Sequence, residues 1–296
     1  MVTYLFPADP LSGRSLRVDH HFAAEYATAL EQGSVGLLDS YTLGDSRPRV
    51  MIAEGSDTRV IYRGWMLSYD EYAALRRGLG DRGYNLITTL PAYLETHSIE
   101  GWAGRFEGLT APTAIFDPST MDASEAVTLA ESVAPEGSYF LKGVSKSDPA
   151  LSREQGADEL LDRLAALGES LGETVRIAIR RYEELDSTVA ELRSWWAQGG
   201  RFGLDLHPNF TGSEKLHPLS VPELLKSVKA FLTELEAPIN GLESGFLTAD
   251  IALRADGSWT LIELGDGQVS GLRRDADWNY LSDFYAELSA RSTLDH

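Results

Sequence analysis

Two acidic residues near the end of the chain have the spacing of metal ligands on a β-hairpin. The segments on either side of Asp256-Gly257 are rich in alternating apolar and β-branched residues, and this pair suits a two-residue type I′ turn. In the resulting hairpin Asp250 faces Glu263, with Cβ atoms roughly 5 Å apart, so the two carboxylates repel unless a cation lies between them. A hard cation such as Mg²⁺, shared with phosphates, would remove the repulsion. The alternative is a solvated acidic hairpin.

The composition limits the classes of function. The chain has 296 residues, 43% of them hydrophobic, which suits a sizeable core in two or three packed subdomains. Its net charge of −19 disfavours nucleic acid and anionic membranes as partners. The absence of cysteine excludes disulfides, thiolate catalysis and cysteine-ligated metals. No signal peptide and no membrane-spanning apolar run is recognisable, so we expect a cytoplasmic protein.

The first part of the chain has the pattern of an α/β domain. A capping box at Ser68-Tyr-Asp-Glu71 begins a helix that Gly80 ends. Pro112 marks the expected boundary of this domain. Short strands are predicted at 2–6, 35–38, 49–52, 59–62 and 84–87.

The rest of the chain also alternates between helices and strands. A second capping box, Asp122-Ala-Ser-Glu125, begins a helix, and a strand over 138–144 contains Lys142. Further strands are predicted over 175–182 and in a hairpin of 191–196 with 201–206. A long amphipathic helix begins at Pro222, and a last helix carries Leu281 and Leu288.

Four features occur in the order seen in ATP-grasp enzymes. They are Lys142 in a strand after a helix, the Arg-Arg-Tyr-Glu-Glu segment at 180–184, the Glu-x-Arg-x-Trp strand at 191–195, and the hairpin of Asp250 and Glu263. The sequence resembles this superfamily over nearly its whole length. Locally, the segments 62–67, 140–147 and 262–270 resemble a poorly characterised bacterial and phage branch of carboxylate–amine ligase-like proteins.

The resemblance implies an α+β ATP-grasp fold. An N-terminal α/β domain over residues 1–110 would precede a small lobe over 111–182 and a large lobe over 183–296, which carries the metal site. In this fold the two lobes clamp ATP.

The resemblance also implies a set of ATP-binding residues. Lys142 would contact the α- or β-phosphate, and Tyr182, Glu183 and Glu184 would form the hinge that reads the adenine edge, with Glu184 holding the ribose hydroxyls. Arg105 stands where many members keep a first nucleotide-binding lysine.

The catalytic and metal residues follow from the same resemblance. Arg193 would stabilise charge on the transferring phosphoryl group and on the acyl phosphate; a structural partnership with Glu191 or Asp205 is the alternative. Asp250 and Glu263 would hold Mg²⁺. The family's usual second metal carboxylate is followed two residues later by Asn, but this chain has Gly265 there, so Asp266 is a candidate ligand in its place.

Other basic residues have a functional and a structural interpretation each. Lys146 is a second candidate for a phosphate, or a solvated loop charge. Arg180 is the favoured member of the Arg180-Arg181 pair for the nucleotide, or part of a structural ion pair. Arg63 suits a substrate carboxylate, or backbone bracing, and Arg273 and Arg274 suit an anionic acceptor.

The sequence thus predicts a Mg·ATP-dependent carboxylate–amine ligase that acts through an acyl phosphate. Its partners would be small-molecule or peptide carboxylates and amines, and we expect a monomer or a homodimer. Two alternatives stay open: a phosphotransferase acting on a non-carboxylate acceptor, and a catalytically inactive nucleotide-binding regulatory protein.

Overall fold

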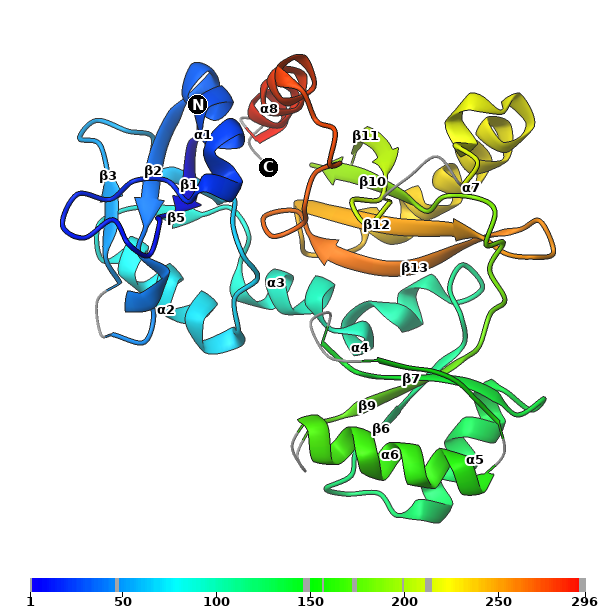
Figure 1. Ribbon diagram of the computed structural model, residues 1–296. Coiled ribbons are helices and arrows are strands. Elements are labelled where there is room, and N and C mark those ends of the chain that lie inside the picture. The colour runs from blue at the N-terminus through cyan, green and yellow to red at the C-terminus, as the bar shows by residue number, and fades with distance from the viewer. Residues whose placement is uncertain are drawn as a thin grey trace.

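The chain is organised around three β-sheets, each formed by a different part of the sequence (Figure 1). The structure is a computed structural model and describes residues 2–45, 48–145, 150–155, 157–171, 175–198, 200–210 and 215–292. Among these residues, none of the helices has the length and apolar character of a membrane span.

The first sheet has the strand order β3-β2-β1-β4-β5, in which only β3 pairs antiparallel. All five predicted strands are confirmed to within one residue. Ser68 and Glu71 form the predicted capping box, and the helix ends at Gly80. The elements are β1 (Thr3–Pro7), α1 (Ala23–Gln32), β2 (Ser34–Leu38), β3 (Val50–Ile52), β4 (Arg59–Tyr62), α2 (Tyr69–Gly80) and β5 (Asn85–Leu86).

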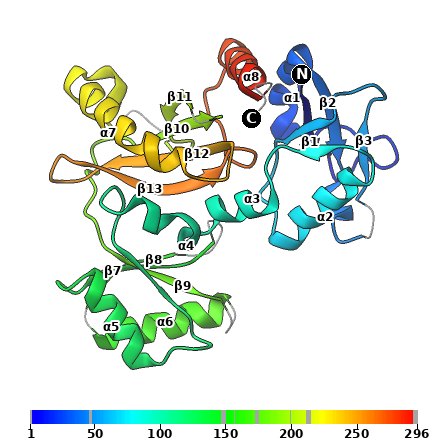
Figure 2. The same cartoon turned by 180° about the vertical axis from the view of Figure 1, so that it is seen from behind.

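The second sheet is antiparallel in the order β6-β9-β7-β8 and forms the small lobe. Both of its helices lie on one face, below the sheet in Figures 1 and 2. The capping box at Asp122 and Glu125 is confirmed, whereas β6 and β8 were not predicted. The elements are β6 (Thr113–Phe116), α5 (Ala123–Val133), β7 (Ser138–Gly143), β8 (Ala150–Gln155), α6 (Ala157–Leu171) and β9 (Ile177–Arg181).

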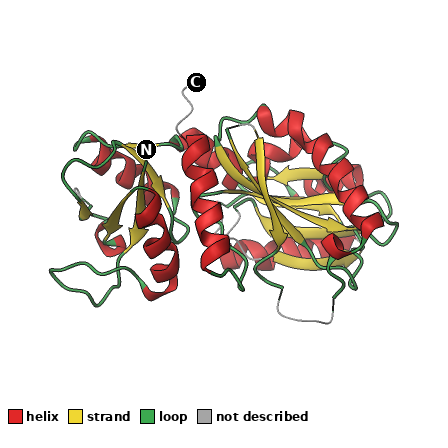
Figure 3. Cartoon of the chain, turned by 90° about the horizontal axis from the view of Figure 1, so that it is seen from above, coloured by secondary structure: helices red, strands yellow, loops and turns green. Residues whose placement is uncertain are grey.

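The third sheet is antiparallel in the order β11-β10-β12-β13 and forms the large lobe. Both predicted hairpins are present in it. Seen from above, the strands of the two lobes lie between helices (Figure 3). The elements are β10 (Leu192–Ala197), β11 (Gly200–Leu206), α7 (Pro222–Asn240), β12 (Phe246–Leu253) and β13 (Trp259–Asp266).

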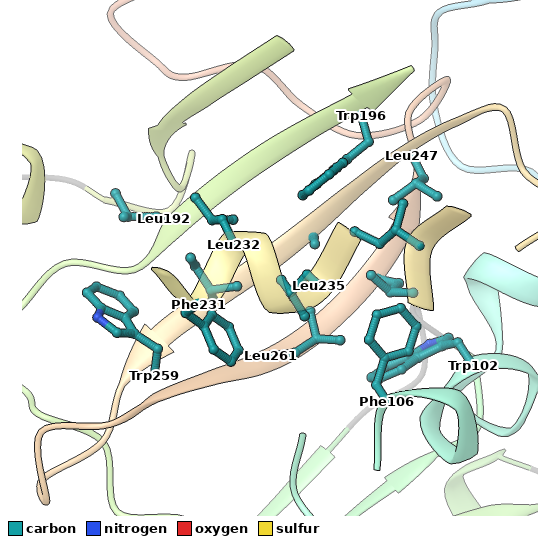
Figure 4. Close-up of a cluster of buried hydrophobic side chains, with 14 of the residues drawn as sticks. Trp102, Phe106, Leu192, Trp196, Phe231, Leu232, Leu235, Leu247, Trp259 and Leu261 are labelled. Atoms are coloured by element: carbon teal, nitrogen blue, oxygen red, sulfur yellow. The ribbon is translucent and has the colours of Figure 1, made fainter. Parts of the chain in front are cut away.

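The helices that join these parts pack across the predicted domain boundaries. Trp102 and Phe106 follow the first sheet in the sequence, yet they belong to the hydrophobic cluster under the large-lobe sheet, close to Leu261 (Figure 4). In the opposite direction, Tyr285 and Leu288 of the last helix pack in the core of the first domain. Packing therefore couples the three sheets more closely than three sequential domains would be. The joining elements are α3 (Leu90–His97), α4 (Ile99–Trp102), the 3-10 helix Ala103–Phe106 and α8 (Trp278–Ser292).

Candidate active site

The predicted pairing of Asp250 with Glu263 is confirmed, but the turn that produces it is not the predicted one. A type I′ turn needs positive φ at both central residues, and only Gly257, at +86°, has it. The amide of Gly257 donates to Arg254 and that of Arg254 to Ser258, which shifts the pairing by one residue near the turn. A bulge after Asp250 restores the register, so Asp250 and Glu263 are Cα partners.

Four charged residues form one row across the large-lobe sheet. Asp205 pairs with Arg193, Arg193 with Asp250, and Asp250 with Glu263, on β11, β10, β12 and β13 respectively. Residues that face each other across a sheet point to the same side, so the four side chains share one face. We call these residues the charged row.

Arg193 and Asp250 form a buried, two-bond ion pair at the centre of the row. Arg193 Nε lies 2.7 Å from Asp250 Oδ1, and Nη2 lies 2.8 Å from Oδ2. Arg193 also donates to the carbonyl of Gly271 at 2.9 Å. The structural alternative with Asp205 is not realised, because the hydroxyl of Tyr280 donates to Asp205 instead. Burial raises the pKa of Asp205.

Lys142 reaches the same row from the small lobe. Its Nζ lies 3.0 Å from Glu263 Oε1. The repulsion expected between Asp250 and Glu263 is therefore reduced by two cations of the protein itself, Arg193 on one side and Lys142 on the other. A metal ion is not needed to explain why the two carboxylates face each other.

The donor set still fits Mg²⁺. A carboxylate that accepts one hydrogen bond at each oxygen keeps free lone pairs, and Mg²⁺ in nucleotide sites is commonly held by one or two carboxylates together with phosphates and water. Asp250 and Glu263 supply two such groups on one face, beside a lysine suited to phosphate.

Asp266 does not belong to this set, which corrects the sequence prediction. Successive side chains in a strand point to opposite faces, so Asp266, three residues after Glu263, points away from it. Asp266 is fully buried and accepts hydrogen bonds from the backbone and side chain of Gln268. Burial raises its pKa to about 7. Gln268 in turn bonds Tyr72 of the first domain, so the role of Asp266 is at that interface.

A cavity of about 330 Å³ lies next to the row, and we call it the inter-lobe cavity. The predicted hinge residues Tyr182 and Glu183 line it, together with the apolar residues Phe140, Leu185 and Ile262. Because Ile262 precedes Glu263 in β13, the cavity borders the charged row. A flat apolar slot next to a lysine–carboxylate group suits a nucleotide.

The hinge carboxylates lie differently from the prediction. Glu183 accepts hydrogen bonds from Arg254 and Thr260, and Glu184 is exposed beside a larger cavity of about 820 Å³ behind the hinge. Glu191 lines the inter-lobe cavity itself, so it is a better candidate than Glu184 for the ribose hydroxyls. The Glu-x-Arg spacing at Glu191 was the available signal.

Arg180 lines the inter-lobe cavity as predicted, but its contacts also brace the lobes. It donates to Thr110 at 2.7 Å, to Thr113 at 3.2 Å and to the carbonyl of Ile262 at 3.0 Å. Burial lowers the pKa of Arg180 to about 10. The structural alternative therefore holds in part, through neutral groups.

Two other predicted nucleotide residues are not brought to the cavity. Arg105 is partly exposed, 4.0 Å from Glu95, and its guanidinium packs against Gly241 at the end of α7. It lies outside the set of residues that line the inter-lobe cavity. Lys146 lies outside the described residues.

Two residues that the sequence analysis did not assign lie at the site. His207 follows β11, and its Nε2 is 2.9 Å from Arg193 Nη2 and 3.5 Å from Asp250 Oδ2. Lys215 lines the inter-lobe cavity. Both come from the connection between β11 and α7, where the sequence shows no periodic pattern to predict their position.

The three predicted substrate residues line one further cavity. This cavity of about 370 Å³ lies between the first domain and the loop after β13, and we call it the domain-interface cavity. Arg63 is buried in its wall, 2.8 Å from Glu25, and donates to the carbonyls of Gly267 and Ser270. The bracing interpretation of Arg63 therefore applies. Its partners Arg273 and Arg274 are more exposed.

Comparison with known proteins identifies the class of this protein. Residues 125–288, more than half of the chain, match the model of an ATP-grasp domain family, described as the third family of its clade. The chain therefore belongs to the ATP-grasp superfamily and to this family within it. No curated protein matches the chain.

Solved structures share the fold over almost the whole chain. D-cycloserine synthetase DcsG matches with a TM-score of 0.60 and 17% identity, over 98% of this chain and 99% of that one. An ATP-grasp RimK domain protein from Sphaerobacter thermophilus matches at 0.59 and 13%, over 98% of both chains. D-alanine–D-alanine ligase from Bacillus anthracis, complexed with ATP, matches at 0.58 and 13%, over 98% and 97%. The predicted α+β ATP-grasp fold is thus confirmed.

Proposed function

We propose that the protein is a Mg·ATP-dependent ligase that joins a carboxylate to an amine. The observation that carries the proposal is the meeting of Lys142 of the small lobe with Glu263 of the large lobe, 3.0 Å apart, beside the inter-lobe cavity. Phosphoryl transfer depends mainly on positioning and on neutralising charge. Groups from both lobes that converge at one point fit that requirement.

Each residue has a defined role in this proposal. Adenosine occupies the inter-lobe cavity against Tyr182, and Lys142 holds a phosphate. Asp250 and Glu263 hold Mg²⁺, which when bound neutralises phosphate charge. Arg193 donates to the transferring phosphoryl group, for which its planar fork of donors is suited.

The chemistry has two steps. The substrate carboxylate attacks the γ-phosphorus, an acyl phosphate forms, and ADP leaves. The amine then attacks the acyl carbon, so that a C–N bond replaces the C–O bond and phosphate departs. Closure of the lobes would keep water from the acyl phosphate.

A screen for ADP release tests this proposal. Amino acids and peptides serve as candidate carboxylates and amines, with mass spectrometry of the products. We expect ADP formation that depends on an added amine and a product equal in mass to both substrates minus water. A phosphorylated acceptor, or ATP binding without turnover in every mixture, would contradict it. Glu263→Gln is the inactive control.

A further inference from the structure

The domain-interface cavity has a local charge opposite to that of the whole chain. Arg63 in its wall is neutralised by Glu25 at 2.8 Å. Arg273 and Arg274 add two positive charges, and of these only Arg273 has a nearby acid among the described residues, the exposed Asp275 at 3.3 Å. A cationic cavity in a protein of net charge −19 favours an anionic group on the molecule that binds there.

The guanidinium of Arg274 is oriented but still able to bind. Its Nε donates to the carbonyl of Pro208 at 2.7 Å, which fixes the side chain. Among the described residues, its two terminal nitrogens donate no hydrogen bond to protein. Such a fork matches a carboxylate, which can accept two parallel hydrogen bonds from it.

The opposite side of the cavity presents an aromatic surface. Trp65 is 48% exposed, although its ring is held on three sides. Its Nε1 donates to Asp19 at 3.2 Å, and the rings of Phe22 and His21 pack edge-on at 5.0 and 5.1 Å. A large aromatic side chain that is rigid and half exposed offers a face for a second ring.

The cavity also adjoins the charged row. Gly271 lines the cavity, and its carbonyl accepts the hydrogen bond from Arg193. Arg273 pairs with Asp275, and Arg274 is held at the carbonyl of Pro208, so both arginines are anchored outside the row. A carboxylate held by the two arginines therefore lies beyond the phosphoryl-transfer centre and is not the one that is activated.

We propose that this cavity binds an aromatic amino acid as the amine substrate. Its carboxylate lies on Arg274 and Arg273, its ring lies on Trp65, and its amine attacks the acyl phosphate. The nitrogen forms the new C–N bond and loses a proton to solvent, while phosphate leaves with the C–O bonding electrons. The amine role rests on the ligase activity proposed above, whereas the binding does not.

Calorimetric titration of the full chain with three probes tests the proposal. Phenylalanine should bind. Phenylalaninamide lacks the carboxylate and alanine lacks the ring, so each should bind at least about tenfold more weakly, a difference of about 1.4 kcal/mol. Failure of phenylalanine to bind, or equal binding of the acid and its amide, would overturn the inference.

Variants locate the site. Trp65→Ala should weaken phenylalanine binding about tenfold and leave alanine binding nearly unchanged; Trp65→Leu replaces it if the alanine variant does not fold. Arg274→Gln should reduce the preference for acid over amide. Trp278→Ala is the matched control, because Trp278 is also 48% exposed and does not line the cavity. Wild-type binding in both Trp65 variants would refute the assignment.

The two proposals fail separately. Selective phenylalanine binding without any turnover would refute the ligase activity alone. Turnover with other amines, together with no binding of phenylalanine, would refute the aromatic substrate alone.

Discussion

Replacing Asp250 by Asn distinguishes two physical accounts of the charged row. If repulsion between Asp250 and Glu263 dominates, removing one charge should stabilise the protein in the absence of Mg²⁺. If the ion pair with Arg193 dominates, the same change leaves a buried guanidinium without its carboxylate and should destabilise the protein. The geometry favours the second account.

The burial of the pair sets the magnitude. The side chains of Arg193 and Asp250 are only 6% and 4% exposed, and removing one partner of such a pair costs about 3 to 5 kcal/mol. Relief of the repulsion with Glu263 returns roughly 0.2 to 1 kcal/mol. With an unfolding entropy of about 2.1 cal/mol/K per residue, a net loss of about 3 kcal/mol lowers the Tm of this chain by roughly 5 °C.

Glu263→Gln is the matched variant, since Glu263 is 24% exposed and its partner Lys142 12%. Solvent screens this pair more, so we expect a loss of about 1 kcal/mol or less. Both variants should lose Mg²⁺-dependent turnover, because each removes a metal carboxylate. Calorimetric melting without Mg²⁺ and ADP release with Mg·ATP measure the two effects separately.

The reasoning fails if Asp250→Asn melts at or above the wild-type temperature, or if the two variants lose equal stability. A double-mutant cycle with Arg193→Gln adds a check. The double variant should be more stable than the sum of the single effects predicts, because it leaves neither charge unpaired.

Three further predictions concern the nucleotide, the catalytic arginine and the domain interface. Mg·ATP should raise the Tm by mass action, and Lys142→Ala should remove most of that shift while Lys229→Ala, on the exposed side of α7, keeps it; an unchanged shift in Lys142→Ala would mean that this lysine faces away from the phosphates. Arg193→Ala should lower kcat by roughly 10² to 10³ with near-normal ATP affinity by calorimetry, and Arg193→Lys should rescue it poorly; wild-type turnover would eliminate the catalytic role. Burial raises the pKa of Asp266 from 3.8 to about 7, so the native state binds more protons than the unfolded chain in that window and the unfolding free energy falls as pH rises through it. Asp266→Asn should flatten this dependence in melts across the window, and a profile parallel to the wild type would show that Asp266 is ionised when buried.

Much of the architecture could be read from local sequence patterns. The capping boxes at Ser68 and Asp122 determine where two helices begin, because each satisfies backbone donors within four consecutive residues. Alternating apolar residues placed the hairpin, and with it the pairing of Asp250 and Glu263. The order of Lys142, the hinge segment, Arg193 and this hairpin was sufficient to indicate the ATP-grasp family.

Tertiary structure decided which of these charged groups meet. The bulge after Asp250 kept the predicted pairing although the turn differed, and no local pattern predicts it. Strand alternation removed Asp266 from the metal set, since one residue of register moves a side chain to the other face of a sheet. The contacts of His207 and of Arg63 join segments far apart in the sequence. Their partners depend on how sheets and loops pack, which local propensity does not encode.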